Sequence, residues 1–487
     1  MRASVAVPPA DVSCIGAELS RALTRRRVLA QAALTLDGSR RGYSERVEIV
    51  LYIVGVLSVV VGLAVSIALH ELGHFAPAKW FGVRVGQFMI GFGPTIFSRH
   101  RGETEYGLKW IPLGGYISMS GMYPPVKEGG RVRGASTGFF QTLVQDARNA
   151  SAGTVVAGEE QRAFYRLPVL KRVIIMLGGP FMNLVIAVVL YAVLLMGFGI
   201  PQLSTTIGSV NECVLPASSE RQECAAGDAA APGAEAGLRP GDRIVAINGE
   251  QIDYWNQVTG AVRPAAGDPL TLDIERDGAP LSVIVTPLLT ERYAIDAEGD
   301  VVEAADNAPV LEEVGFVGVG AATETVRQPA GEVLPAVGDN VVRVVEIIIS
   351  LPQRMVDVAQ AAFGTEERDP NGPISVVGVG RIAGEIASLD TIPVVDRIAS
   401  ITGVIASLNV ALFVFNLIPL LPLDGGHIAG ALWEGLRRRL AKLFGRSEPG
   451  PVDTARLVPI TLVVVVVLGA MSALLIYADL VNPIQLF

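Results

Sequence analysis

The sequence predicts a polytopic α-helical membrane protein with about four transmembrane helices and a small β-rich domain inserted between the second and the third. Of the 487 residues, 50% are hydrophobic and only 18% are charged, and the mean hydropathy is +0.45, which is above the level of soluble domains. Four stretches are long and apolar enough to span a bilayer, and a stretch with alternating apolar residues separates two of them. The spans are expected at residues 47–80, 173–200, 399–424 and 457–480.

The first span leads into the pentapeptide His-Glu-Leu-Gly-His, residues 70–74. Helical residues i and i+4 share one face, so His70 and His74 can direct imidazole nitrogens at one Zn²⁺ while Glu71 reaches a water at the metal. Ionisable groups inside a span are costly and therefore indicate function. A helix end with polar residues at the headgroups would explain one of these side chains, but not three at ligand spacing. Because this span is too long for the apolar core of a signal peptide, we expect it to be retained.

A zinc site needs a third protein ligand, and the end of the third span offers one. Asp424 is the only acidic residue in the apolar stretch 416–427. Pro419 and Pro422 interrupt the helix, and the following glycine pair lets the backbone bend around the carboxylate. Irregular, charged backbone at membrane depth is tolerated only where it is buried in protein or lines a wet cavity. Asp424 is therefore the candidate third ligand.

Basic residues indicate the orientation of the spans. They gather in the loops between spans one and two and between spans three and four, whereas the segment between spans two and three contains no lysine and many acidic residues. The loops at 125–172 and 425–456 are therefore expected in the cytoplasm, the β-rich domain on the exported side, and the zinc site toward the cytoplasmic side. The basic residues in question are Lys79, Arg84, Arg99, Arg101, Lys109, Arg166, Lys171, Arg172, Arg437, Arg438, Arg439, Lys442 and Arg446.

The extension at residues 1–46 contradicts this orientation, because it should lie outside and yet makes the approach to the first span rich in arginine. Two explanations stay open. Either the extension is cytoplasmic and an extra re-entrant element follows it, or the true start of the protein lies downstream, near Val47 or Val50. We favour the second explanation, which detection of arginine-rich N-terminal peptides from the native protein would contradict.

His-Glu-x-x-His in one span, followed by Asn-x-x-Pro-x-x-x-x-Asp-Gly in a later one, resembles the bacterial site-2 proteases, intramembrane zinc metalloproteases that include the regulator of sigma-E protease. The resemblance implies that His70, His74 and Asp424 bind Zn²⁺, that Glu71 is the general base, and that Asn416 contributes to the active-site cavity. One departure is that the second proline of the motif follows the first by three residues, whereas the family often has two. We expect this to alter a local kink and not the chemistry.

Two further stretches extend the resemblance. Glycine turns and short extended segments within 81–124 resemble the family's membrane re-entrant β-hairpin loop, which is thought to hold unwound substrate as an added strand; an ordinary cytoplasmic hairpin is the alternative. The segment Gly178–Asn183 opens the second span as in the family, where small residues permit close helix packing. Asn183 either lines the cavity or bonds across helices, and we favour the structural role.

The exported stretch resembles one circularly permuted PDZ domain at about residues 205–290. Glycine turns within 234–249 and an Asn-Gly hairpin signal at its end precede two alternating runs, as expected of a small β-rich domain. Such a domain either recruits substrate or excludes bulky ectodomains, and we favour exclusion. Residues 291–398 are expected to be an exported linker with an amphipathic helix at 334–351, which either lies in the membrane interface or packs on the soluble domain.

Three side chains carry open alternatives. Cys213 and Cys224 are close enough in sequence to form a disulfide in an oxidising compartment, or they stay reduced. His427 follows the Asp-Gly-Gly turn and either hydrogen-bonds Asp424 or merely caps the helix. The stretches 125–163 and 364–372 lack periodicity and are expected to be loops.

The predicted function is zinc-assisted hydrolysis of peptide bonds within the bilayer of the bacterial inner membrane. By resemblance, the partners are single-span membrane proteins already cut by another protease, such as anti-sigma factors or remnant signal peptides, and the process is regulated intramembrane proteolysis. Besides these substrates, the expected partner is the lipid bilayer and not a nucleic acid. A catalytically inactive PDZ scaffold is the main alternative, and the intact set His70, Glu71, His74 and Asp424 argues against it. A metal transporter or an anchored soluble metalloprotease would not need this arrangement.

Overall fold

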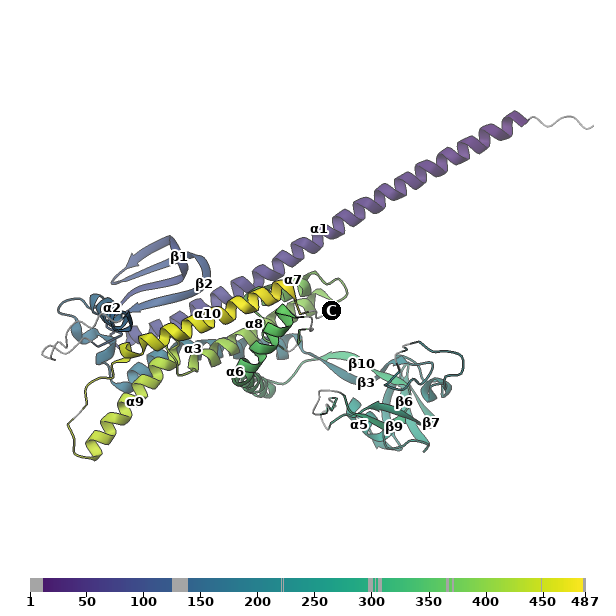
Figure 1. The fold of residues 1–487 in the computed structure, drawn as a ribbon. Coiled ribbons are helices and arrows are strands. Elements are labelled where there is room, and N and C mark those ends of the chain that lie inside the picture. The colour runs from purple at the N-terminus through teal and green to yellow at the C-terminus, as the bar shows by residue number, and fades with distance from the viewer. Residues whose placement is uncertain are drawn as a thin grey trace, which may run out of the picture. The chain divides into compact units, whose positions relative to one another are not determined.

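The computed structural model describes residues 12–124, 139–219, 221, 223–296, 301–302, 304, 309–364, 368–369, 372–447 and 449–484, with the side chains of 12–45, 112–113 and 139–142 excepted. The chain divides into two compact units (Figure 1): a helical unit, and a second unit at Leu195–Pro329. Within the extension at 1–46, the first eleven residues lie outside the described ranges, and from Val12 the backbone belongs to the first helix.

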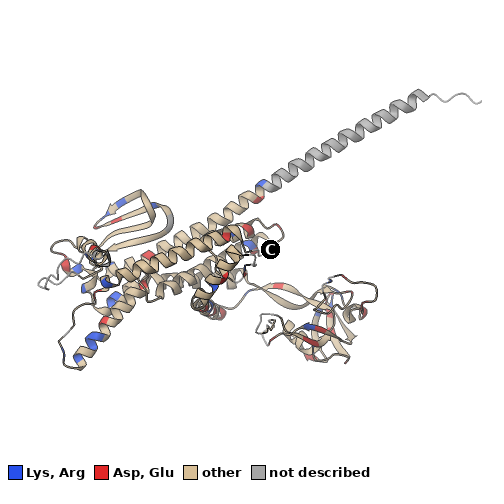
Figure 2. Ribbon diagram, in the orientation of Figure 1, with Lys and Arg blue, Asp and Glu red and all other residues tan. Residues whose placement is uncertain are grey.

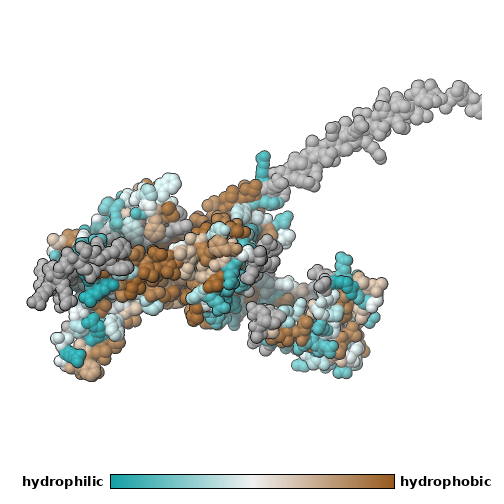
Figure 3. Space-filling view, viewed as in Figure 1, coloured by the Kyte–Doolittle hydropathy of each residue, from teal (hydrophilic) through white to brown (hydrophobic). Residues whose placement is uncertain are grey.

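Within the described residues, four helices are long and apolar enough to cross a membrane, as predicted. They are α1 (Val12–Trp80), α3 (Val169–Ala192, continued by a π-helical turn at Val193–Phe198), α8 (Val394–Leu417) and α10 (Val458–Val481). In the most apolar 18-residue stretch of α1, α3 and α8, only 17% of the residues are buried inside the protein. In the corresponding stretch of α10, none is buried. The space-filling view shows the resulting apolar surface (Figure 3). Such faces need lipid to cover them, which agrees with a membrane protein.

The third predicted span extends too far, because the chain breaks between two helices before Asp424. Helix α8 ends at Leu417, and α9 (Asp424–Leu443) begins with Asp424 in its first turn. The two prolines end α8, since proline lacks the amide hydrogen that helix continuation requires. The predicted loop at 425–456 is therefore largely helical, and in Figure 2 Lys and Arg gather along this helix. Similarly, α2 (Phe139–Gly153) lies inside the stretch predicted as a loop.

Helix α6 (Val333–Phe363) contains the predicted amphipathic segment and packs inside the helical unit. Val337 and Val344 of α6 contact a cluster of α3 and α8 residues that includes Ala187 and Val410. The face of α6 that contains Val337 and Val344 therefore packs on helices of the helical unit, whereas apolar side chains such as Leu334 and Ile349 are exposed. A position in the membrane interface stays a prediction. Helix α7 (Val376–Ser388) follows and packs on α1. The predicted linker at 291–398 is accordingly divided between both units.

The loop after α1 is a long hairpin that folds back on itself. Strands β1 (Val85–Arg101) and β2 (Thr104–Met119) are antiparallel. The first part of β1 pairs on one side with Gly115–Met119 and on the other with residues 105–108, and the second part of β1 pairs with the start of β2. One face of this sheet contacts α1, where the Phe75 ring packs edge-on against Phe88 and Tyr106. The fold therefore brings the middle of the hairpin onto the helix that carries the zinc motif.

The second unit is a β-sheet domain with its own core. Its main sheet has the strand order β10-β3-β4-β6-β7, with β5 beside β4, and a separate pair is formed by β8 and β9. Asn248 and Gly249 have positive φ in the turn between β4 and β5, as the Asn-Gly signal predicts. The elements are β3 (Ile200–Val210), α4 (Pro232–Glu235), β4 (Arg243–Ile247), β5 (Glu250–Gln251), α5 (Trp255–Val262), β6 (Leu270–Arg276), β7 (Ala279–Val285), β8 (Leu288–Tyr293), β9 (Leu311–Phe316) and β10 (Val319–Val326).

This unit is larger than the predicted 205–290. Strand β10 pairs with β3 along most of its length, so the unit closes only with a strand from beyond the predicted boundary. Long-range strand pairing of this kind has no local sequence signal. Its buried core includes Ile207, Ile244, Leu272 and Val285. Cys213 and Cys224, the pair left open by the sequence, are joined by a disulfide.

A buried carboxylate in the second unit makes its stability pH-dependent. Arg276 donates to both oxygens of Asp242 at 2.7 Å, and the Arg239 N–H donates at 2.8 Å. These donors, Arg276 foremost, hold the pKa of Asp242 below its ordinary 3.8. Because the folded pKa is lowered, the stabilisation is complete above about pH 3.8 and is lost as the pH falls further.

We expect the melting temperature of the second unit in the whole protein to fall between about pH 4 and pH 2, and to fall less in Asp242→Asn. Differential scanning calorimetry across this range checks the difference. An equally steep fall in both proteins would show that other carboxylates carry the pH dependence.

Candidate metal centre

The three predicted ligands converge at one point. Helical spacing places His70 and His74 on one face of α1, and the chain break after α8 delivers Asp424 from the first turn of α9. The Nε2 atoms of the two histidines are 3.2 Å apart, and Asp424 Oδ2 lies 3.3 Å from His70 Nε2 and 3.2 Å from His74 Nε2. Both histidines are buried. Three residues from two distant segments thus direct one ligand atom each at a common centre.

These distances match the size of a tetrahedral zinc site. Ligand atoms that each lie 2.0–2.1 Å from a tetrahedral Zn²⁺ are about 3.3 Å from one another. Asp424 Oδ2 is buried and receives no hydrogen bond from a donor of the described residues. A buried carboxylate oxygen beside two imidazole nitrogens is costly unless a cation lies among them. A donor set of two imidazoles and one carboxylate is that of catalytic zinc sites, in which water or substrate takes the fourth position.

The opposite ring nitrogens of both histidines are held by helix α3. The backbone carbonyl of Ile175 accepts a hydrogen bond from His74 Nδ1 at 2.7 Å. A carbonyl cannot donate, so the proton of a neutral His74 is on Nδ1 and Nε2 is left as a lone pair. The amide of Asn183, which is fully buried, lies 3.0 Å from His70 Nδ1.

The Asn183 amide also completes the site for a metal. Its Oδ1 has no partner among the described residues. Rotation of the amide by half a turn brings Oδ1 to His70 Nδ1, where it accepts a hydrogen bond from Nδ1–H and leaves the Nε2 lone pair of His70 free to bind a metal. Asn183 therefore bonds across helices, which is the favoured prediction, and its partner is the predicted metal ligand His70.

Close approach of α1 and α3 depends on glycine. A Cβ on Gly73 would lie 2.2 Å from the carbonyl oxygen of Gly178, so the two helices touch through their backbones. A Cβ on Gly179 would lie 2.2 Å from His74 Nε2 and 2.7 Å from His70 Nε2. The space beside Gly179 is thus the space in which the ligand atoms meet. The close helix packing predicted at Gly178 and Gly179 therefore leaves space for the side chains of His70 and His74.

The remaining predicted residues take different positions. The side chain of Glu71 lies against strand β2, where a Cβ on Gly115 would be 2.9 Å from Glu71 Cγ. The Asn416 amide donates to the Leu412 carbonyl of its own helix at 3.0 Å and makes no described contact with the ligands. The ring of His427 contacts Tyr123, with ring centroids 6.4 Å apart, and the described contacts include no hydrogen bond from His427 to Asp424.

Comparison with known proteins agrees with this centre. The family model described as "Peptidase family M50" matches residues 58–447, which include His70, Glu71, His74 and Asp424. The chain belongs to peptidase family M50. Among its relatives, zinc metalloprotease Rip1 of Mycobacterium tuberculosis (strain ATCC 25618 / H37Rv) is 34% identical over 446 residues, which cover 90% of this chain and 100% of that protein.

More distant relatives of this M50 peptidase carry similar names. Zinc metalloprotease Rip1 of Mycolicibacterium smegmatis is 32% identical, and the matched region covers 89% of this chain and 99% of that protein. Metalloprotease MmpA of Caulobacter vibrioides is 28% identical and covers 80% of this chain and 88% of its own length. The predicted family and enzyme class are therefore confirmed.

Sequence reasoning missed two features of the centre. The Ile175 carbonyl carries no signal, because any residue could supply that backbone group. Gly179 was recognisable only as a small residue in a span. Its closeness to the ligand nitrogens arises from the pairing of two helices about a hundred residues apart in sequence.

Proposed function

We propose that this M50 peptidase cleaves single-span membrane proteins within the bilayer, with a zinc ion held by His70, His74 and Asp424. The observation that carries the proposal is the meeting of these ligand atoms within 3.3 Å of one another. The two histidines and Glu71 lie on α1, which is long and apolar enough to span a membrane, and Asp424 begins the helix that follows a second such helix. A metal ligand set at this depth serves little purpose other than chemistry on a membrane-embedded substrate.

In the proposed reaction, one residue transfers the proton and two others orient the histidine ligands. When bound, zinc supplies Lewis acidity toward the attacking water and the scissile carbonyl. The Glu71 carboxylate then accepts the proton of the water at one Oε atom and returns it to the nitrogen of the leaving amine. Ile175 and Asn183 hold the histidine rings so that Nε2, and not Nδ1, faces the metal.

Substitution of Glu71 by glutamine tests this function. We expect Glu71→Gln to keep wild-type zinc content and to cleave a helix-destabilised single-span peptide about 10²–10⁴-fold more slowly, because general acid–base catalysis contributes factors of that size. Zinc analysis and peptide cleavage are measured side by side on the purified protein in detergent. Turnover that survives the substitution, or wild-type protein that binds no zinc, would favour the inactive scaffold or another catalytic centre.

The folded hairpin supports substrate binding by strand addition. A transmembrane substrate helix hides its carbonyls in its own hydrogen bonds and must unwind before hydrolysis. Strand Gly115–Met119 lies beside Glu71 and has no strand partner on its outer edge within the described residues. An unwound segment could therefore gain backbone hydrogen bonds along this edge, in keeping with a membrane re-entrant hairpin. Substrates already trimmed by another protease, as in regulated intramembrane proteolysis, fit this route.

The second unit is proposed to be a PDZ domain on the exported side of the bacterial inner membrane, with the zinc site toward the cytoplasm. Its small helices and its five-strand path with an Asn-Gly turn are compatible with that domain type. The Cys213–Cys224 disulfide supports an oxidising compartment. The basic residues of α9 support a cytoplasmic position for that helix. We propose that the domain excludes bulky ectodomains and admits trimmed substrates.

A further inference from the structure

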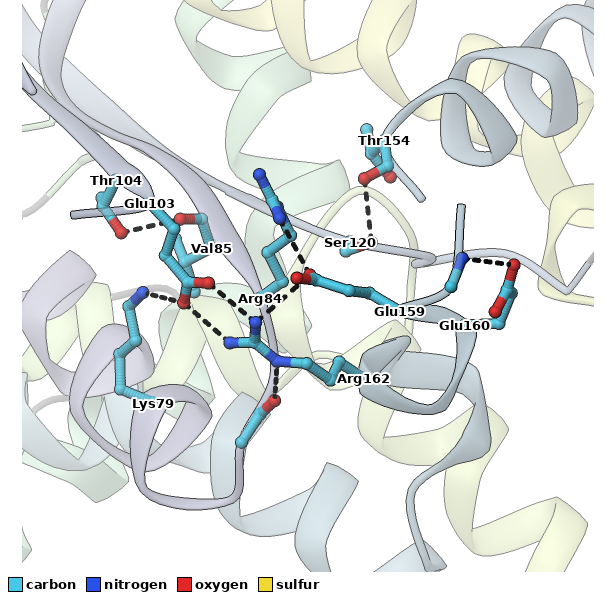
Figure 4. Close-up of polar contacts among 12 residues, drawn as sticks. Lys79, Arg84, Val85, Glu103, Thr104, Ser120, Thr154, Glu159, Glu160 and Arg162 are labelled. Carbon is cyan, nitrogen blue, oxygen red and sulfur yellow. Dashed lines mark hydrogen bonds and ion pairs between the residues drawn. The ribbon is translucent and has the colours of Figure 1, made fainter. Parts of the chain in front are cut away.

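A cluster of charged residues fastens the tip of the hairpin to the end of α1 (Figure 4). Glu103, in the turn between β1 and β2, accepts a hydrogen bond from Lys79 Nζ at 2.6 Å. The Nη1 and Nη2 atoms of Arg162 each donate a hydrogen bond to one oxygen of Glu103, both at 2.8 Å. We refer to Lys79, Glu103 and Arg162 as the hairpin clamp.

Arg162 joins the tip of the hairpin to its base. Its Nε donates to the carbonyl of Gly82, just after α1, at 3.0 Å, and its own carbonyl accepts the N–H of Arg84. Glu159 pairs with Arg84 at 2.8 Å and with Arg162 at 3.2 Å. Arg162 thus contacts the chain just after α1 and the turn of the hairpin through its guanidinium, and the residue before β1 through its backbone carbonyl.

The tip of the hairpin, around Glu103, lies beside its base, around Val85, because the start of β2 pairs with the first part of β1. The Thr104 hydroxyl, next to Glu103 in the turn, donates to the Val85 carbonyl at 2.7 Å. At the end of β2, the carbonyl of Ser120 accepts the N–H of Phe164 at 2.9 Å. The segment around Arg162 therefore holds both ends of the hairpin by backbone hydrogen bonds and its tip by charge.

The contacts between the sheet and α1 extend from Glu71 to Lys79, with the Phe75 ring between them. At one end of this range, Gly115 lies against Glu71, and at the other, Glu103 is paired with Lys79. Glu71 and Lys79 are eight residues apart, or about 12 Å along a helix. A slip of one residue would move a strand by about 3.3 Å and turn its side chains to the other face. The pairing of Glu103 with Lys79 opposes such a slip of the strand that contains Gly115 along α1.

We propose that Glu103 and Arg162 are positioning residues for proteolysis, because they set the register at which strand Gly115–Met119 lies beside Glu71. This inference rests on the proposed function. A substrate segment paired with the outer edge of that strand meets the zinc site at one peptide bond only if the strand itself is held in one register. Loosening of the clamp would let neighbouring bonds reach the site.

The charges of the clamp are suited to positioning more than to stability. Side-chain exposures of 26% for Glu103 and 36% for Arg162 leave the pair in partial contact with solvent, where ion pairs stabilise proteins little. Hydrogen bonds from Arg162 and then Lys79 lower the pKa of Glu103 to about 2. The carboxylate therefore stays charged throughout the physiological pH range, so the ion pairs of the clamp do not depend on pH in that range.

The test compares Glu103→Gln, Arg162→Gln and Arg162→Lys with the wild type in detergent. Glu160→Gln is the matched control, because Glu160 lies two residues from Arg162, and its described hydrogen bond is to the Gly158 N–H, outside the clamp. The measurements are bound zinc, melting temperature, kcat and KM on a single-span peptide, and the positions of the cleaved bonds by mass spectrometry. Wild-type cleavage of this peptide that depends on zinc establishes the proposed function independently of the clamp.

We expect all variants to keep wild-type zinc and melting temperature. Glu103→Gln and Arg162→Gln should lower kcat/KM by about tenfold to a hundredfold and add cleavage at neighbouring bonds, since small misplacements at an active site cost factors of this size. Arg162→Lys, which keeps the charge but loses the two-nitrogen contact, should fall between them and the wild type. Unchanged rate and cleavage position would overturn the proposal, and so would a loss of rate that only follows a loss of zinc or melting temperature.

Discussion

Gly179→Ala is expected to abolish metal binding and with it all zinc-dependent peptide cleavage. The new Cβ would lie 2.2 Å from His74 Nε2 and 2.7 Å from His70 Nε2, distances that real Cβ atoms do not adopt, so at least one ligand must move out of the site. Removal of one ligand atom from a three-ligand zinc site leaves two, too few for a stable catalytic centre. Zinc content of the purified protein, measured by atomic emission, checks this expectation.

Gly403→Ala is the matched control, because it adds the same methyl group to another spanning helix. A Cβ there would lie 3.7 Å from Leu194 Cδ2, an ordinary contact. We expect wild-type zinc and activity for this variant. Retention of zinc in Gly179→Ala would mean that the ligand nitrogens meet elsewhere than beside Gly179.

Asp479→Ala is expected to destabilise the helical unit by about 3–5 kcal/mol, the usual cost of leaving one partner of a buried ion pair unpaired. Asp479 of α10 pairs with Arg368, and their side chains are only 3% and 2% exposed. The other Asp479 oxygen accepts the N–H of Ser375 at 2.7 Å, just before α7. The carboxylate thus joins the end of α10 to the start of α7. Thermal unfolding in detergent measures the loss.

Two companion variants make this expectation specific. The double substitution Arg368→Met with Asp479→Leu should recover most of the stability, because apolar residues of similar size replace buried pairs at little cost. Glu275→Ala removes the exposed pair with Arg243 in the second unit and should change the melting temperature little. Equal losses in Asp479→Ala and Glu275→Ala would show that burial of the Arg368 pair contributes nothing.

Local patterns predicted the spans and two of the three ligands well. A span is recognised by a continuous run of apolar residues, and His70 and His74 share a face because helical spacing alone determines it. Asp424 was recognisable as an isolated carboxylate in an apolar stretch. Its place in the first turn of a new helix was not, because the extent of that helix depends on how α9 packs against α3.

The second unit and the hairpin were predicted less completely. The β-rich stretch was recognisable from turns and alternation, but β10 joins β3 across more than a hundred residues, and such pairing leaves no local trace. The hairpin was recognisable from its glycines, whereas the pairing of its tip with Arg162 was not, because Arg162 lies in a stretch without periodicity.

By itself, the sequence predicted the apolar spans and a candidate centre of two histidines, a glutamate and an aspartate, because apolar length and helical spacing are properties of neighbouring residues. Only the tertiary structure decided how the centre is completed. Ile175 holds the His74 ring through a backbone carbonyl, Asn183 holds His70, and Gly179 leaves the space between them. These roles depend on the close contact of α1 with α3, and a contact between distant segments is specified by packing, which no single segment encodes.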